Sequence, residues 1–386
     1  MKFKICLSDA PLLLSYIIFP IVMFGTGLLE LKIPRQWLDV SWVMLFLVSS
    51  TVVLASKKQF NFVGYLNSTV YIFYILLFMF LMNGLMYALS GNYINIYPLL
   101  LEAKLLFYLL FSIVWFMSFG GVNIRYIPVY GAILGIVIIV GLVVGSIERG
   151  YISRSVGSGE INYDAMLLLL AFVASIYSKE RVRVIYLWLI FLGLLATMSR
   201  TMILSLLVIV FIFEKRISLF SKLLLMCVGM AVVMYSFYVR DLEFTLDSLD
   251  RYWMWYSAMQ LLVNLDPVIL FGAFPAGGLP VIIPEPLEWL WGHQAEGWGV
   301  EGIFSFQYHA FWLRLFLTWG IVGCIIFTGL LIYFYKIGDA IVRPVAIIII
   351  LAGFTMGVFY ISNAAIVIWL LVLSALKSKY LHRYKI

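Results

Sequence analysis

Arg200 is the residue of this sequence whose position most directly suggests chemistry. It is the one charged residue between Val184 and Phe213, in a run that is otherwise apolar. An arginine in such a run costs about 3 kcal/mol or more unless it has an anionic partner. The sequence therefore predicts one of two arrangements: a structural ion pair, for example with Glu102, or a cationic pocket that binds an anionic ligand.

Other charged residues fall at a similar depth in neighbouring apolar segments. Glu102 and Lys104 follow the start of one segment, and Arg314 lies about one turn into another, just after His309. His309 and His293 are too isolated to make a metal site, and none of the established zinc or nucleophile motifs is present. We therefore expect no metal.

The composition is that of a membrane protein. The chain has 386 residues, of which 64% are hydrophobic and 12% charged, whereas a soluble domain is about half apolar and a quarter charged. The net charge of +7 could suggest nucleic acid. The basic residues instead occupy short loops between apolar segments, which is typical of topology signals. We expect no nucleic-acid partner.

Twelve apolar segments are candidate membrane spans. They predict the fold class: an all-α polytopic membrane protein with about 12 transmembrane helices and one large helical periplasmic loop. Most Lys and Arg residues fall on one side if the N-terminus is inside, which puts both termini in the cytoplasm. The predicted segments cover residues 11–29, 40–55, 65–88, 98–119, 127–147, 164–178, 184–199, 201–213, 223–238, 309–335, 345–361 and 363–376.

The run from Val184 to Phe213 must contain a break. As one helix it would be about 45 Å long, more than the ~30 Å of a bilayer core. It would also put its basic flanks on opposite sides. The chain is therefore expected to cross outward and return, with Arg200 at the outer turn. Since both arms are short, that turn should lie below the headgroups, against protein or a water-filled cavity.

The predicted domains are residues 1–238 with nine spans, the loop 239–308, and residues 309–386 with three spans and a cytoplasmic tail. Within the loop, Asp247 or Ser248 can cap a helix from Asp250 to Leu265. The aromatic residues of this helix suit a position along the membrane surface, where some could stack on sugars.

Four features, in this order, resemble the bacterial O-antigen ligase and O-antigen polymerase superfamily. They are Ser-Arg in "ATMSRTMILSLL" (Arg200), an arginine opening a Trp-containing helix in "RYWMWYSAMQLL" (Arg251), the segment "DPVILFGAFPAGG" (Gly272), and a histidine before "GIVG" (His309 and Gly320). The resemblance covers roughly residues 190–325. Where the family often has His-Asn, this chain has His309-Ala310.

The resemblance implies a glycosyltransferase that uses a glycan on undecaprenyl pyrophosphate as donor, with no cofactor and no metal. His309 would be the general base for an acceptor hydroxyl, because an ordinary histidine has a pKa near 6.5. Arg200 and Arg251 would bind the pyrophosphate bidentately. Arg240 is the alternative to Arg251, and Arg314 and Lys104 are further candidate cations. The partners would be lipid-linked oligosaccharides as donor and acceptor, membrane lipids, and a chain-length regulator.

Three functions stay open at this point. The first is polymerisation of repeat units at the periplasmic face of the bacterial inner membrane, with inversion at the anomeric centre. The second is ligation of the glycan to lipid A–core, which the resemblance covers equally. The third is transport of lipid-linked sugars, which usually involves internal repeats and polar sites at the midplane. We find no repeat here, and the charges gather near one face.

Overall fold

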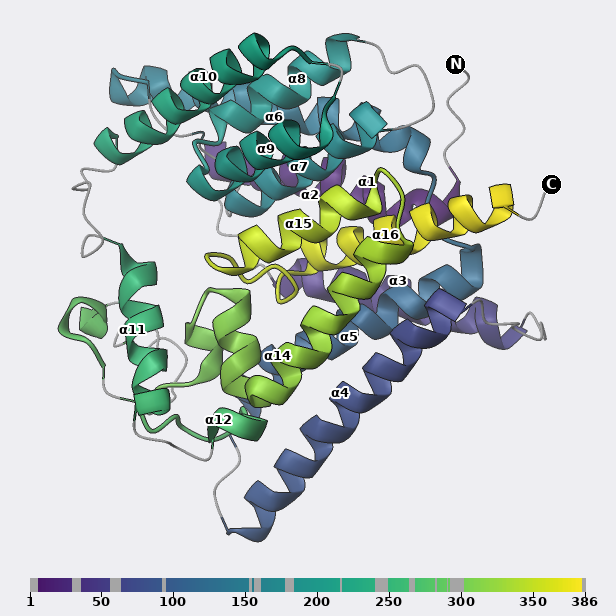
Figure 1. Cartoon of the computed structure of the whole chain (residues 1–386), viewed down its shortest axis with the longest axis vertical. Coiled ribbons are helices and arrows are strands. Elements are labelled where there is room, and N and C mark those ends of the chain that lie inside the picture. The colour runs from purple at the N-terminus through teal and green to yellow at the C-terminus, as the bar shows by residue number, and fades with distance from the viewer. Residues whose placement is uncertain are drawn as a thin grey trace.

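The computed structural model describes residues 6–29, 36–55, 64–91, 95–152, 155, 161–177, 184–215, 217–239, 249–263, 268–281, 283–289, 291 and 302–383. Throughout these residues the regular elements are helices (Figure 1). The longer ones are α2 (Phe19–Leu28), α3 (Gln36–Ala55), α4 (Gly64–Leu89), α5 (Ile96–Phe119), α6 (Ile127–Arg149), α7 (Ile161–Tyr177), α8 (Val184–Ala196), α9 (Arg200–Phe213), α10 (Leu219–Tyr238), α11 (Asp250–Val263), α14 (Phe311–Ile337), α15 (Val342–Gly353) and α16 (Ser362–Arg383). The short ones are η1 (Leu7–Asp9), α1 (Ala10–Leu13), η2 (Leu14–Ile18), η3 (Ile124–Tyr126), α12 (Val268–Phe271) and η4 (Ser305–Gln307).

Each apolar segment predicted from the sequence contains a helix. Among the described residues, 8 helices are long and apolar enough to cross a membrane. Four shorter apolar helices accompany them: Ile161–Ile176, Val184–Ala196, Arg200–Phe213 and Val342–Gly353. The chain is thus a helical, multi-pass membrane protein. One boundary was wrong: the segment predicted to run to residue 361 is helical only to Gly353.

Several helix ends meet at one end of the bundle, which we call the basic end. Lys377 Nζ donates to Gly120 O at the C-terminus of α5 (2.8 Å), and Lys379 Nζ donates to Gly338 O just after α14 (3.2 Å). A lysine is favourable there because unpaired carbonyls and the helix dipole attract a cation. The first helices start at the same end, where Asp9 accepts a hydrogen bond from Asn123 N (2.8 Å). The last turns of α16 lie on the right-hand side of Figure 1.

The segment between α10 and α14 packs at the opposite end around a core of its own. Met254, Ala258 and Leu261 of α11 are at most 1% exposed and contact a cluster that includes Trp291 and Tyr308. The predicted helix is confirmed as Asp250–Val263, while its expected caps, Asp247 and Ser248, lie outside the described residues. Because one face of α11 is buried in protein, only the other face can contact lipid or ligand.

Helix α14 is broken at Gly320, which has φ 63° and ψ −165°. Gly272, with φ 81°, lies directly against this break, where a Cβ atom would come 2.2 Å from Thr318 C. The adjacent Ala273 N donates to Leu317 O (2.7 Å) and so satisfies a carbonyl of the interrupted helix. Two separate features of the family resemblance therefore meet in space.

Candidate functional site

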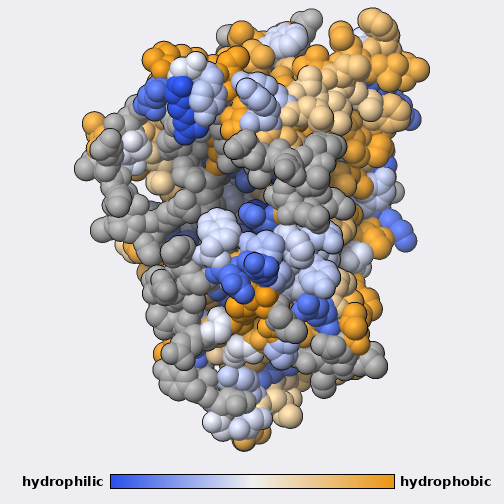
Figure 2. Space-filling model, turned by 90° about the vertical axis from the view of Figure 1, so that its left-hand side faces the viewer, coloured by the Kyte–Doolittle hydropathy of each residue, from blue (hydrophilic) through white to orange (hydrophobic). Residues whose placement is uncertain are grey.

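The connection between α15 and α16, residues 354–361, is the element around which the candidate residues gather. Two side chains of α11, one turn apart, donate to its backbone: Arg251 Nε to Thr355 O (3.0 Å) and Trp255 Nε1 to Phe354 O (3.0 Å). These carbonyls follow the C-terminus of α15, where a positive charge is stabilised by the helix dipole. The connection thus fixes α11 to the membrane-spanning part. Figure 2 shows the left-hand side of Figure 1, the side on which α11 lies, and there hydrophilic residues gather between hydrophobic ones.

Arg251 is held by one edge of its guanidinium only. Nε is bonded to Thr355, and in the described part of the chain the two terminal nitrogens have no hydrogen-bond partner. Burial lowers the pKa of Arg251, and the nearby Asp250 and Tyr163 partly oppose that shift. A guanidinium stays charged in proteins regardless. The terminal fork is therefore a positioned cation with capacity for an anion.

His309 lies beside this arginine, between η4 and the start of α14. Burial, Arg251 and Arg314 lower its pKa from 6.5 to about 4. The pKa of His309 thus departs from the ordinary histidine value, first because burial disfavours the charged imidazole and second because two guanidiniums disfavour a third positive charge. No described residue donates to or accepts from the imidazole. The ring is neutral at pH 7 and can accept a proton.

Arg314 forms a buried ion pair with Glu102. Arg314 Nη2 and Nε donate to Glu102 Oε1 (2.9 and 3.1 Å), and Ser305 Oγ donates to the same oxygen (3.0 Å). Tyr360 stacks beneath the guanidinium, with its ring centre 3.5 Å from Cζ. The suggested pairing of Glu102 with Arg200 is wrong, since Arg314 takes that place. Its charge is balanced, so Arg314 is a weaker candidate for binding phosphate than Arg251.

Gly357 marks the point where three elements converge. Its N–H donates to the Tyr163 hydroxyl of α7 (3.2 Å). A Cβ atom on Gly357 would lie 3.4 Å from both His309 O and Tyr163 Oη and 3.8 Å from Arg314 Nη1. These are ordinary contact distances, so the position could accept one methyl group and no more. Tyr163 and Gly357 are site residues that the sequence reasoning missed.

Arg200 reaches the same connection through its neighbour. The predicted break is confirmed: α8 ends at Ala196 and α9 begins at Arg200, after a turn in which Met198 has φ 49°. The helices have 13 and 14 residues, about 20 Å each. Arg200 Cζ lies 4.2 Å from the ring centre of Phe237 in α10. Thr201 Oγ1 is hydrogen-bonded to Thr355 Oγ1 (2.7 Å).

Lys104 does not join this group. Lys104 Nζ pairs with Asp39 Oδ2 of α3 (2.6 Å), and Tyr108 donates to the other oxygen of Asp39 (3.2 Å). Since Lys104 follows Glu102 by two residues, it lies on a different face of α5. Arg240 lies outside the described residues.

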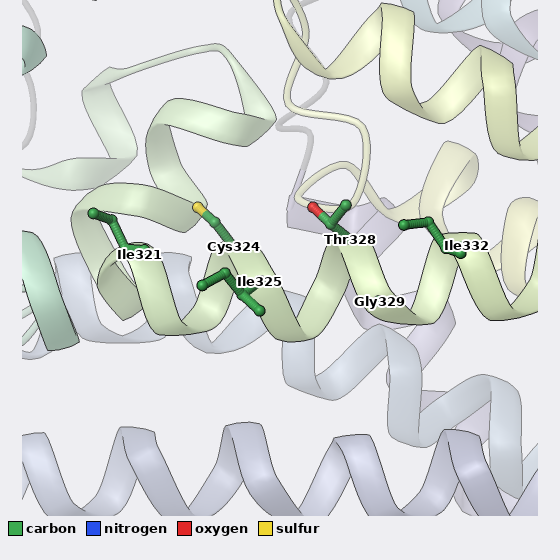
Figure 3. Close-up of a pocket in the computed structure, with 6 residues that line it drawn as sticks. All are labelled: Ile321, Cys324, Ile325, Thr328, Gly329 and Ile332. Atoms are coloured by element: carbon green, nitrogen blue, oxygen red, sulfur yellow. The ribbon is translucent and has the colours of Figure 1, made fainter.

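A surface groove on α14 is separate from these residues. It measures about 380 Å³ and is lined by Ile321, Cys324, Ile325, Thr328, Gly329 and Ile332, which all come from the half of α14 after the break (Figure 3). Its lining is almost wholly apolar and carries no charge, so it cannot hold a phosphate. The candidate residues for binding an anion lie instead around residues 354–361.

No protein-family model matches the chain, and no curated protein matches it. A function is therefore inferred from the geometry of Arg251, His309 and Arg200 and from the sequence resemblance.

Proposed function

We propose that this protein is a membrane glycosyltransferase that joins undecaprenyl-pyrophosphate-linked oligosaccharides into a longer surface polysaccharide, as an O-antigen polymerase does. The observation that carries the proposal is Arg251, a partly buried guanidinium whose Nε donates to Thr355 O while its terminal nitrogens have no hydrogen-bond partner in the described chain. Such a fork suits the pyrophosphate of the donor. A neutral imidazole lies beside it.

The chemical step uses both groups. An acceptor hydroxyl oxygen attacks the anomeric carbon of the donor, and the bond from that carbon to the phosphate oxygen breaks. The electron pair leaves on the pyrophosphate, where Arg251, with Arg200, stabilises the developing charge. The hydroxyl proton passes to the His309 imidazole. Attack opposite the leaving group inverts the anomeric centre.

A histidine with a pKa of about 4 is a weak base, but binding of the donor would raise that pKa. Two of the causes of the low pKa are the positive charges of Arg251 and Arg314. A bound pyrophosphate compensates such charges, so it raises the pKa of His309 toward the working pH. The base thus becomes effective only when the donor is in place.

The distribution of lysines also supports one orientation of the protein in the membrane. The candidate residues lie near the N-terminal ends of α5 and α14, opposite the basic end, where Lys377 and Lys379 bind helix carbonyls. The positive-inside rule assigns the basic end to the cytoplasm. Both termini would then be cytoplasmic, and the site would face the periplasm of a bacterial inner membrane.

The test is an assay with purified protein in lipid nanodiscs and a polyprenyl-pyrophosphate oligosaccharide as sole substrate. We expect a ladder of products, lost in Arg251→Ala and His309→Ala variants that are purified at normal yield. Unchanged donor would contradict polymerisation. Turnover only after addition of lipid A–core would indicate a ligase, and passage of labelled donor across vesicles without new bonds would indicate a transporter.

A further inference from the structure

Thr355 is bonded to both arginine-bearing elements through two different atoms. Its backbone oxygen accepts from Arg251 Nε of α11 (3.0 Å). Its hydroxyl is bonded to the hydroxyl of Thr201 in α9 (2.7 Å), the residue directly after Arg200. One residue in the connection 354–361 thus links the extramembrane helix α11 to the short helix α9.

We propose that Thr355 is a positioning residue that sets the spacing between Arg200 and Arg251 so that both guanidiniums can bind one diphosphate. The inference rests on the proposed function, because it takes the pyrophosphate as the shared ligand. Thr355 itself, in the connection 354–361, makes no contact with the lipid donor in that proposal.

Two guanidiniums that bind one ligand repel each other while the site is empty, so the protein must hold them by other contacts. Arg251 has its bond from Nε to Thr355 O, and Arg200 lies over the Phe237 ring at 4.2 Å. Helices α9 and α15 pack against each other. The pair of threonine hydroxyls fixes their register at the end where the arginines lie.

Threonine and serine offer the same hydroxyl for the hydrogen bond, but the threonine side chain is more rigid and therefore suits this role better. Its β-branched side chain has few χ1 rotamers, so the hydroxyl is held in one direction. Binding sites need such precision, because a ligand group displaced by about 1 Å loses much of its interaction. Valine has the same shape without the hydroxyl and is therefore the informative replacement.

The experiment measures binding of inorganic pyrophosphate to the full-length protein in nanodiscs by titration calorimetry. We expect Thr355→Val and Thr201→Val each to weaken binding about fivefold, the change that corresponds to one neutral hydrogen bond. The double variant should be no weaker than either single one, because both remove the same bond. Thr355→Ser should bind within about twofold of the unmodified protein.

Ser118→Ala is the matched control. Ser118 Oγ also bonds across two helices, to Ser49 O of α3 (2.7 Å), but toward the basic end of α5. It should leave pyrophosphate binding unchanged although it lowers the melting temperature. A merely structural Thr355 would behave in the same way, so normal binding by a folded Thr355→Val protein would overturn the inference.

The outcomes also separate this inference from the proposed function. If the unmodified protein binds pyrophosphate and Arg251→Ala does not, while both valine variants bind normally, only the role of Thr355 is refuted. If the unmodified protein binds no pyrophosphate, both proposals fall. Should Thr355→Val fail to fold, Thr201→Val tests the same bond from the other side.

Discussion

Removing the charge of Glu102 should destabilise the protein far more than removing that of Asp39. Glu102 is fully buried and the Arg314 side chain is 9% exposed. Glu102→Gln keeps the shape and one acceptor oxygen but leaves the guanidinium without its counter-charge. Breaking a buried pair from one side costs about 3–5 kcal/mol. Because Gln can still accept a hydrogen bond from Arg314, we expect about 3 kcal/mol.

The comparison with Asp39 tests whether burial or the N–O distance determines how much an ion pair contributes to the stability of the protein. The Lys104–Asp39 pair is shorter, 2.6 Å against 2.9 Å, but its side chains are 30% and 36% exposed. Exposed pairs contribute about 0–1 kcal/mol because water screens them and both side chains lose freedom. Asp39→Asn should therefore cost less than about 1 kcal/mol. If distance governed the energy, the order would be reversed.

The assay is reversible unfolding in SDS–detergent mixed micelles, followed by helical circular dichroism. A double variant, Glu102→Met with Arg314→Met, serves as the decisive control, since replacing both charges by apolar groups is often nearly neutral. It should recover most of the stability that Glu102→Gln loses. Equal losses in Glu102→Gln and Asp39→Asn, or a double variant less stable than the single one, would refute the reasoning.

Three further predictions concern activity. The first is a pH profile of kcat/KM for the transfer reaction, which reports the free enzyme. It should be flat from pH 8 to pH 5 and fall only as His309 protonates near pH 4, because the lowered pKa keeps the ring neutral above that value. A midpoint near pH 6.5 would contradict a histidine that is buried beside two guanidiniums. The second is Gly357→Ala, which should fold and yet lose at least about tenfold in kcat/KM, because its methyl would fill the space between His309 and Tyr163. The control is Gly25→Ala, whose methyl would meet no atom within 4 Å and should leave turnover unchanged. Arg251→Lys should lower kcat/KM by about 10²-fold or more, since lysine lacks both the Nε donor and the fork; near-normal turnover would show that a simple point charge suffices.

The sequence predicted the features that depend on local length and pattern. The break before Arg200 followed from the length of the apolar run, since a bilayer limits how far one helix can continue. The structure places it at residues 197–199. The helix Asp250–Val263 followed from its own residues in the same way. Both predictions needed no information about neighbouring helices.

The sequence could not predict which charges meet. Glu102 and Arg314 are 212 residues apart, and their pairing requires that α5 and α14 lie side by side. The connection 354–361 was missed for a different reason. Its residues "FTMGVFYI" are mostly apolar, so hydropathy merged them with the preceding span. Gly353 and Gly357, four residues apart, were the available signal, but the acceptors that matter are backbone carbonyls, which have no sequence pattern.

The balance of charge in the site explains why the two basic side chains nearest His309 have different roles. Arg314 already has Glu102 as its counter-ion, and its guanidinium is covered by Tyr360, so it lowers the pKa of His309 without being in need of a ligand. Among the described residues, Arg251 donates its hydrogen bond to a backbone carbonyl, Thr355 O, and Asp250 offsets part of its charge. His309 therefore stands in a positive electrostatic potential, to which Arg251 and Arg314 both contribute. In the proposed function, an anionic donor would lower that positive potential and strengthen the base in the same event, so donor binding would precede deprotonation of the acceptor.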